Sequence, residues 1–383
     1  MSILRPFWSN RIQQSWSQRS IVWLAGVRRT GKTTLAETFD DSTYINCDLP
    51  SSQRLLEDPE NFYKNLKTRI VIFDEIHQLP EASVLLKIGA DHFKSKKILA
   101  TGSSTLIASK KFKDSLTDRK RNLHFLPVLI SELEAFKCDL KKRILFGGLP
   151  PSLLSDKLDN EFFGEWLDSF YARDVQEIFA VEKRQPFLKA LEFLLMSNGT
   201  QLEVTKLAQA AGISRPTATK YLDILENTKA LTVVRPFSKK SISEMTHQPK
   251  IYGFDTGFYC YVRGIKELRS EDCGVLLENL TLETLQASGY GADLCYWRTK
   301  SQQEIDFVIQ LDRNKIIAIE CKWKEKNFSA NHVESFRRLY PDGPNWVVTS
   351  DSTTRTVETK NLKLEFISIF DLEKKLVALK KSK

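Results

Sequence analysis

The sequence predicts an α/β protein of several domains, with a parallel sheet near the N-terminus and a second α/β domain near the C-terminus. Three observations indicate this. The chain has 383 residues, which is more than one typical domain. Apolar runs between residues 21 and 104 alternate with helical patterns, as in a parallel sheet. Residues 304–322 read as two strands joined by a turn at Arg313.

The composition narrows the class of protein. The hydrophobic content of 42% can build real cores, and the net charge of +9 favours an anionic partner, nucleic acid first. Six scattered cysteines without a CxxC pair argue against a zinc site and against a disulfide framework. The N-terminus lacks a signal-peptide core and no run reaches membrane-spanning length, so we expect a cytoplasmic protein without membrane contact.

A phosphate-binding loop follows the first apolar strand. Residues 26–34, GVRRTGKTT, satisfy G-x-x-x-x-G-K-[ST] between a strand and a helix, the context that this motif needs. The loop N–H groups and the helix N-terminus face phosphate oxygens in such motifs. Lys32 is expected to reach the β and γ phosphates of ATP, and Thr33 to place its hydroxyl on Mg²⁺. The expected nucleotide ligands in the loop are Gly26, Gly31, Lys32, Thr33 and Thr34.

A second strand brings acids to this site. RIVIFDE at 69–75 has four consecutive apolar residues, as in a strand covered on both faces, and ends in Asp74 and Glu75. Asp74 is expected to hold the Mg²⁺ shell, and Glu75 to orient or deprotonate the attacking water. An Asp-Glu pair also occurs at ordinary helix N-termini, but the phosphate loop favours the catalytic interpretation.

Two further strands complete the predicted sheet. KILATGSS at 97–104 ends in hydroxyls, of which Thr101, Ser103 and Ser104 either sense the γ-phosphate or cap the next helix. TYINCD at 43–48 adds another strand. The sheet is therefore expected to have at least four strands.

Several segments resemble a family of predicted prokaryotic ATPases of the AAA+ superfamily, whose C-terminal domain of unknown function resembles restriction endonucleases. GVRRTGKTTL, IVIFDEIHQLP, ILATGSS, LPVLISELEAF, GGLP and YARDVQEI occur in the family's order, and the similarity runs from about residue 20 to about residue 370. The resemblance implies an Mg²⁺-dependent ATPase that forms a homo-oligomer. It also implies that Arg119 contacts phosphate, possibly that of a neighbouring subunit, with Arg173 as a second candidate. A surface salt bridge is the alternative for either arginine. The family usually has Gly where this chain has Asp118.

The middle of the chain is predicted to be helical. Apolar residues three and four apart at 131–195 are typical of the lid that covers nucleotide in AAA+ proteins. A helix-turn-helix follows, with Gly212 at the turn and Ser214 as the cap of the second helix. A strand and a basic segment then suit a winged helix. Arg215 and Lys220 point outward on its second helix, which either reads DNA or packs on another domain or subunit.

The hairpin at 304–322 collects charge on one face. Numbered outward from Arg313, Asp306 lies opposite Glu320, and Glu304 lies opposite Lys322. The pattern resembles the restriction-endonuclease-like fold, and the resemblance implies three metal ligands and a lysine beside the attacking water. The implied ligands of Mg²⁺ or Mn²⁺ are Asp306, Glu320 and Glu278, the last from the helix predicted at 274–285, and the implied catalytic lysine is Lys322. The alternatives are a solvated charge cluster and a remnant site that no longer cleaves.

The expected domain order has seven parts: an N-terminal leader at 1–20, a P-loop ATPase core at 21–130, a helical lid at 131–195, a winged helix at 196–258, a linker at 259–273, an endonuclease-like α/β domain at 274–372 and a basic tail at 373–383. The expected function is ATP hydrolysis coupled to a process on DNA. The alternative is a nucleotide-driven switch whose winged helix and inactive nuclease-like fold only bind a protein or DNA.

Overall fold

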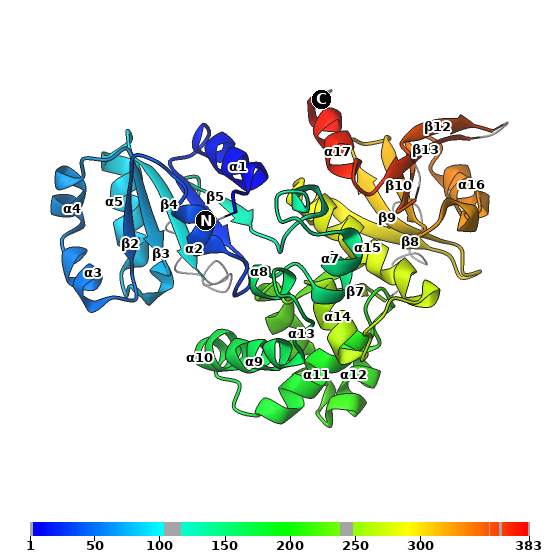
Figure 1. Cartoon of the computed structure of the whole chain (residues 1–383), viewed down its shortest axis with the longest axis horizontal. Coiled ribbons are helices and arrows are strands. Elements are labelled where there is room, and N and C mark those ends of the chain that lie inside the picture. The colour runs from blue at the N-terminus through cyan, green and yellow to red at the C-terminus, as the bar shows by residue number, and fades with distance from the viewer. Residues whose placement is uncertain (1–2, 103–115, 238–247, 352, 360–361, 382–383) are drawn as a thin grey trace.

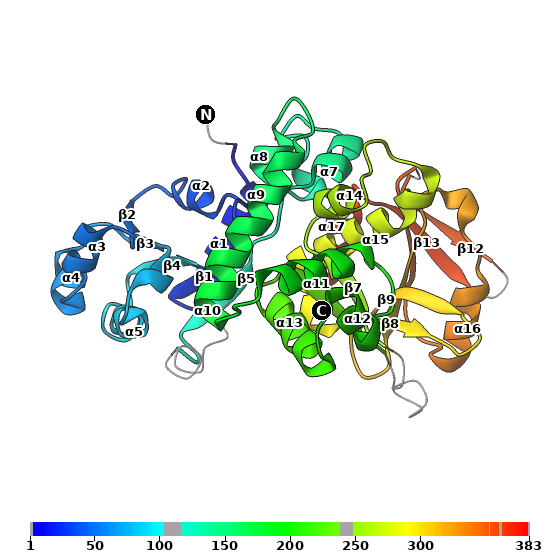
Figure 2. The same cartoon turned by 90° about the horizontal axis from the view of Figure 1, so that it is seen from below.

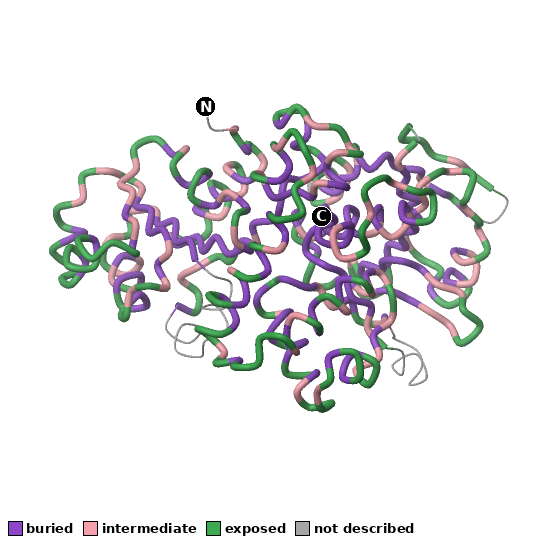
Figure 3. Tube along the Cα trace, turned by 60° about the horizontal axis from the view of Figure 1, so that its bottom comes forward, coloured by how far each residue is buried: buried purple, intermediate pink, exposed green. Residues whose placement is uncertain are grey.

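The computed structural model describes residues 3–102, 116–237, 248–351, 353–359 and 362–381. Ser103 and Ser104 lie outside the described residues. Figure 1 shows the sheet domain of the N-terminal part (blue to cyan) at one end of the molecule and the C-terminal sheet (yellow to red) at the other, with green helices below and between them. In Figure 3 the buried residues run through the N-terminal sheet and through the interior of the rest of the molecule. Within the described part of the chain, no helix has the length and apolarity needed to cross a bilayer.

The N-terminal sheet has five parallel strands in the order β2-β3-β4-β1-β5. Their bounds are Ile21–Ala25 for β1, Ser42–Asn46 for β2, Ile70–Asp74 for β3, Lys97–Gly102 for β4 and Lys120–His124 for β5. Strand β1 lies between β4 and β5 and is buried throughout, because helices cover both faces of the sheet. The prediction of a parallel sheet with at least four strands is confirmed.

Among the described residues, the helices that surround this sheet are α1 (Pro6–Trp16), α2 (Lys32–Ala36), α3 (Pro50–Leu55), α4 (Pro59–Asn65), η1 (Ile76–Gln78) and α5 (Ala82–His92). Helix α1 corrects the expectation of a separate leader at 1–20. Trp8, Ile12 and Trp16 recur every four residues, lie buried on one helix face and pack against the sheet. The ATPase core therefore includes this helix.

The helical middle is larger than predicted. It comprises η3 (Ile130–Glu132), α7 (Leu140–Phe146), α8 (Pro150–Leu153), α9 (Asn160–Phe170), the π-helical turn η4 (Tyr171–Gln176), α10 (Glu177–Phe179), α11 (Arg184–Met196), α12 (Val204–Ala211), α13 (Arg215–Asn227) and α14 (Thr256–Val262). Aromatic residues of α9 share one hydrophobic core with α11, α12 and α13. The predicted boundary at 195 therefore does not separate two cores.

The helix-turn-helix has the predicted local geometry. Gly212 ends α12 with a φ of 65°, which favours glycine, and the Ser214 hydroxyl accepts from the Thr217 N–H at 3.3 Å as the cap of α13. Tyr221, Leu222 and Leu225 are buried on the inner face of α13. Two strands follow, β6 (Leu231–Pro236) and β7 (Lys250–Gly253), paired antiparallel.

These two strands belong to the C-terminal sheet. Its eight strands run in the order β12-β13-β11-β10-β9-β8-β6-β7, because β6 pairs in parallel with β8. The remaining strands are β8 (Leu294–Arg298), β9 (Glu304–Gln310), β10 (Ile316–Cys321), β11 (Asn345–Thr349), β12 (Arg355–Glu358) and β13 (Lys363–Ser368). The linker expected at 259–273 therefore does not divide two independent domains, since the chain on either side of it builds one sheet.

Five helical elements complete this half: α15 (Ser270–Ala287), η6 (Gly291–Asp293), η7 (Glu325–Asn327), α16 (Asn331–Leu339) and α17 (Leu372–Lys381). Helix α17 corrects the expectation of a basic tail at 373–383. Leu372 and Leu376 are fully buried and lie in the same core as the apolar residues of α15. Lys374 and Lys380 are exposed on the outer side of this packed helix.

Candidate nucleotide site and carboxylate cluster

The phosphate-binding loop depends on two glycines for different reasons. Gly26 directly follows β1 and lies against the backbone of Phe125. A Cβ added at Gly26 would lie 2.3 Å from the carbonyl oxygen of Phe125. Gly31 has a φ of 92° and forms the N-cap of α2, a backbone conformation that favours glycine. Together they let the chain turn from strand into helix in a few residues. The loop lies at the carboxyl end of β1, an interior strand, where parallel α/β sheets bind ligands.

Lys32 is folded into this loop. Its Nζ donates to the carbonyl oxygens of Gly26 at 3.0 Å and Val27 at 3.1 Å. Burial lowers the pKa of Lys32, and the nearby carboxylates of Glu75, Asp174 and Asp74 act in the opposite direction. The ammonium is therefore held by neutral carbonyls, which a phosphate can replace.

Asp74 is buried at the end of β3 and is surrounded by hydroxyl donors. The hydroxyls of Thr33 and Tyr44 each donate to Asp74 Oδ2 at 2.7 Å, and the hydroxyl of Thr101 donates to Oδ1. The side chain of Thr33 is thus beside the carboxylate that was predicted to share Mg²⁺ with it. A hydroxyl and a carboxylate at this spacing suit a hard cation, so the residues fit the expected metal. Tyr44 was not anticipated.

Glu75 has a φ of 52°, uncommon for a residue with a side chain. Its N–H donates to Thr101 Oγ1 at 3.2 Å, and its Oε2 lies 3.2 Å from His77 Nδ1. Strained backbone of this kind is concentrated at functional sites. Thr101 therefore contacts both acids from the adjacent strand.

Helix α9 and the turn η4 cover the loop on one side (Figure 2). Arg28 Nε lies 2.5 Å from Asp174 Oδ2, and Trp166 Nε1 donates to the carbonyl of Arg28 at 3.1 Å. Arg29 lies 3.9 Å from Glu165. The helical middle thus contacts the nucleotide loop directly. Thr34, another predicted ligand, is exposed on α2.

Arg119 requires a correction. It precedes β5, whose first residue pairs with Ile21 at the start of β1, whereas the phosphate loop follows the last residue of β1. The length of β1, about 16 Å, separates it from the loop. Its Nε lies 2.7 Å from Asp91 Oδ1, as in the salt-bridge alternative. Arg119 therefore does not contact nucleotide in its own chain, and contact with a neighbouring subunit stays a prediction. Arg173 is exposed.

The hairpin of β9 and β10 has the predicted register. Ile317 pairs with Ile309 and Ile319 with Phe307, which centres the turn on Arg313. Asp306 and Glu320 are 6% and 1% exposed, so the solvated-cluster alternative is wrong for these two residues.

One lysine brings the two hairpin carboxylates together. Lys322 Nζ lies 2.8 Å from Glu320 Oε2 and 3.8 Å from Asp306 Oδ2, so both carboxylates face the same small volume. Asp306 Oδ2 also accepts from the N–H of Cys321 at 2.8 Å.

A residue that the sequence reading missed lies among the carboxylates. Lys250, the first residue of β7, is 2% exposed. Its Nζ forms an ion pair with Glu304 and lies 3.7 Å from Glu278 Oε2 and 3.8 Å from Asp306 Oδ1. The hydroxyl of Tyr252 donates to the same Glu278 oxygen at 2.8 Å. The alternation of Lys250 and Tyr252 along one strand face was the available signal.

The predicted metal centre in this cluster does not fit the structure. Glu278, Asp306 and Glu320 do gather, but the ammonium groups of Lys250 and Lys322 stand between them. Among the described residues, no group of three or more His, Cys, Asp or Glu is arranged to hold a metal ion. Burial, reinforced by the charge of Asp306, raises the pKa of Glu320 to about 8 and that of Glu278 to about 7.

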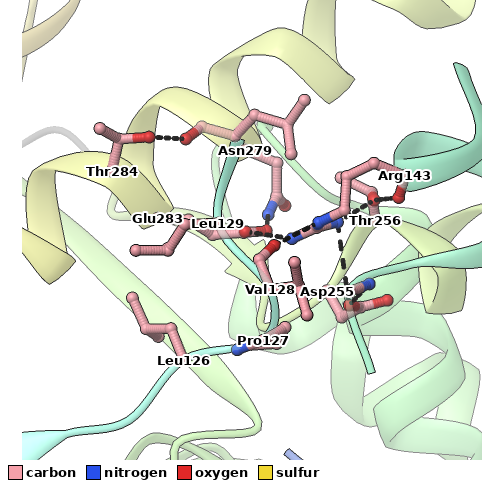
Figure 4. Close-up of polar contacts among 12 residues, drawn as sticks. Leu126, Pro127, Val128, Leu129, Arg143, Asp255, Thr256, Asn279, Glu283 and Thr284 are labelled. Carbon is pink, nitrogen blue, oxygen red and sulfur yellow. Dashed lines mark hydrogen bonds and ion pairs between the residues drawn. The ribbon is translucent and has the colours of Figure 1, made fainter. Parts of the chain in front are cut away.

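A second buried network joins the segment after β5, the helical middle and α15 (Figure 4). Arg143 is fully buried, and its guanidinium donates to the Val128 carbonyl at 2.6 Å, to the Thr256 hydroxyl at 3.0 Å and to Glu283 of α15. Asp255 accepts from the N–H of Gly148 at 2.6 Å. Burial raises the pKa of Glu283 to about 7, against the opposing charge of Arg143. The segments GGLP (residues 147–150) and YGFDTG (residues 252–257) are thus held together by charged hydrogen bonds.

Three family models match successive parts of the chain. Residues 18–134 match a model described as an AAA domain, residues 137–269 a domain of unknown function (DUF8612) and residues 273–367 another domain of unknown function (DUF4143). The matched ranges end close to the end of β5 and to the start of α15.

Curated relatives of known sequence are similar over most of their length. Uncharacterized proteins of Mycobacterium tuberculosis and Mycobacterium bovis are each 26% identical over 313 residues, which cover 79% of this chain and 70% of the relative. An uncharacterized protein of Haemophilus influenzae is 22% identical over 321 residues, covering 74% of this chain and 78% of that protein.

Two solved structures were also matched. A DNA replication initiation factor is 14% identical with a TM-score of 0.27, covering 62% of this chain and 84% of that one. Cdc6p from Pyrobaculum aerophilum is 12% identical with a TM-score of 0.26, covering 67% and 93%. Scores this low carry no argument. The AAA-domain match agrees with the parallel sheet and with the phosphate loop at its carboxyl edge. Residues 18–134 therefore form a P-loop ATPase domain of the AAA class.

Proposed function

We propose that the chain is an Mg²⁺-dependent ATP hydrolase whose C-terminal half couples nucleotide state to a partner, nucleic acid first. One observation carries the enzymatic part. Lys32, the Thr33–Asp74 pair and Glu75 converge at the carboxyl edge of three neighbouring strands, with Thr101 ordering the two acids. This is the set of groups that phosphoryl transfer to water requires.

Each residue has a separate part in the proposed reaction. Lys32 leaves the carbonyls of Gly26 and Val27 to neutralise the β and γ phosphates. Thr33 and Asp74 would hold an Mg²⁺ ion, which would neutralise phosphate charge, and Glu75 would accept the proton of the attacking water. The contacts of Arg28 and Arg29 with α9 and η4 place the helical middle where it can respond to an occupied loop.

The test is ATP hydrolysis and binding by Lys32→Ala, with exposed Lys94→Ala as the matched control. Loss of the phosphate contact should weaken ATP binding by about tenfold or more and remove turnover. The control should behave as wild type. Wild-type turnover by Lys32→Ala would refute the assignment.

The proposed nucleic-acid contact is the winged helix formed by α12, α13, β6 and β7. Arg215 and Lys220 are exposed on α13, whose inner face is occupied by the core. A basic outer face on the second helix is the arrangement that places side chains in a DNA groove. The same exposed face, with its two positive side chains, also suits a protein partner.

Binding of fluorescent duplex DNA at several salt concentrations tests this contact. The double reversal of Arg215 and Lys220 to Glu should lower the salt dependence by about two units if each makes one phosphate contact. Reversal of Lys67 and Lys94, which are exposed on the ATPase domain, is the control for the same change in net charge. Unchanged DNA binding with altered ATP turnover would favour the protein-facing alternative.

A second function has its own supporting observation. The ion-paired state of Glu278 and Asp306 favours a nucleotide-driven switch, in which a nuclease-like C-terminal fold binds but does not cleave. The Arg143 network gives such a switch a physical path, since it joins Val128 after the ATPase sheet to Glu283 on α15. A homo-oligomer, with Arg119 released from Asp91 to act on a neighbour, is part of the proposal and is tested by mass measurement with and without ATP.

A further inference from the structure

The cluster at the end of the hairpin contains an unusual number of buried charges. Four carboxyl groups gather there: Glu278, Glu304, Asp306 and Glu320. Three cationic side chains contact them, Lys250, Lys322 and Arg298, the last through Glu304 at 2.8 Å. Buried carboxylates require such neutralisation, because their desolvation otherwise costs several kcal/mol per group. The charges nearly balance within the protein itself.

Lys250 has the position that a metal ion would need. Its Nζ contacts oxygens of three carboxylates that come from two elements, α15 for Glu278 and β9 for Glu304 and Asp306, while Lys250 itself lies on a third element, β7. A divalent cation binds such oxygens at about 2.0–2.6 Å from a point among them. An ammonium and a cation cannot share that point. The Lys250 side chain and a metal therefore exclude each other.

The sheet fixes Lys250 at this point. The residue pairs with Val234 of β6 and forms an isolated bridge with Gln201, so its backbone is held on two sides. Its Nζ also lies 5.7 Å from the centre of the Tyr296 ring, within the range of a cation–π contact. Two residues later, Tyr252 donates to Glu278. A surface lysine could rotate away from a metal into solvent, whereas the Lys250 side chain is buried and would have to break these contacts to leave.

We infer that Lys250 is the resident cation of this cluster and that it excludes a divalent metal from Glu278, Glu304 and Asp306 while β7 stays paired. The cluster then fastens β7 to α15 and β9, and so joins the helix-turn-helix to the C-terminal sheet. The inference does not depend on ATP hydrolysis.

Binding of Mn²⁺ to the full chain without nucleotide tests the inference, followed by the loss of the free-ion electron paramagnetic resonance signal. Wild type and Asp306→Asn should bind the same amount of Mn²⁺. Lys250→Met, which keeps the length of the side chain and removes its charge, should bind one additional Mn²⁺ at least about tenfold more tightly than wild type. That gain should disappear in the double variant with Asp306→Asn, which assigns the ion to this cluster rather than to Asp74.

Two results would overturn the inference: Asp306-dependent Mn²⁺ binding by wild type, or binding by a folded Lys250→Met that equals that of wild type. Far-ultraviolet circular dichroism establishes folding. If Lys250→Met does not fold, Lys250→Met with Glu304→Gln restores the balance of charge and is tested in the same way. If that variant also fails, the wild-type titration decides, because Asp306-dependent binding contradicts the inference and its absence supports it.

Discussion

The nucleotide loop and the carboxylate cluster both bury a lysine near acids, but they give it different partners. Lys32 donates to two backbone carbonyls, whereas Lys250 contacts three carboxylates. A neutral carbonyl is replaced by phosphate with a gain in electrostatic energy, and a carboxylate is not. Asp74 shows the same contrast, since its side-chain partners are hydroxyls, while those of Asp306 are the ammonium groups of Lys250 and Lys322. A buried charged group can therefore bind a ligand when its partners in the protein are neutral, and is blocked when they carry the opposite charge.

The largest expected effect is the loss of ATP hydrolysis by a substitution confined to the nucleotide site. Glu75→Gln keeps the size of the side chain and removes the proton acceptor. ATP turnover should fall by about 10²–10⁴-fold with little change in ATP affinity. Steady-state hydrolysis and equilibrium binding, measured on the same sample, check this. Turnover at the wild-type rate would mean that another group accepts the proton.

The same substitution at the two buried lysines sharpens the comparison. Lys250→Met leaves three carboxylates without their ammonium, so unfolding free energy should fall by about 3–5 kcal/mol. Lys32→Met removes hydrogen bonds to carbonyls only, and the cost should be about 1 kcal/mol. Urea unfolding of both variants, without nucleotide, measures these values. Equal losses would contradict the difference in partners.

The pH dependence of stability is the smaller effect. The fold raises the pKa of Glu320 from 4.5 to about 8, so the folded chain holds a proton that the unfolded chain releases across this range. Glu320 therefore lowers stability as pH rises from about 5 to 8. Wild type should lose unfolding free energy between these pH values, and Glu320→Gln should avoid on the order of 2 kcal/mol of that loss.

Urea unfolding at both pH values checks this prediction. Exposed Glu358→Gln in the same half of the molecule is the control and should leave the slope unchanged. A wild-type slope in Glu320→Gln would show that other groups carry the proton.

The candidate nucleotide site could be proposed from the sequence because its main parts are local. The loop from Gly26 to Thr33 is one short segment, and Asp74 follows from the end of an apolar strand. The role of Thr101 and the presence of Tyr44 required the order of strands, which periodicity does not give. The hairpin register was likewise predicted, since its two strands are adjacent in sequence.

The remaining differences come from contacts between distant segments. The pairing of β6 with β8 joins residues about sixty positions apart and merges two predicted domains into one sheet. Lys250 reaches the cluster only through that pairing, so the metal prediction had no way to include it. Helix α1 was different, because the spacing of Trp8, Ile12 and Trp16 already marks an apolar helix face.

The central claim is that hydrolytic chemistry belongs to the nucleotide site, while the hairpin carboxylates are held in ion pairs. The most direct measurement follows ATP hydrolysis and the nicking of supercoiled DNA in one wild-type sample with Mn²⁺, beside Asp306→Asn. We expect ATP hydrolysis in both proteins and no nicking beyond the background that they share. Mn²⁺-dependent nicking by wild type that Asp306→Asn abolishes, with ATP hydrolysis intact, would contradict the claim.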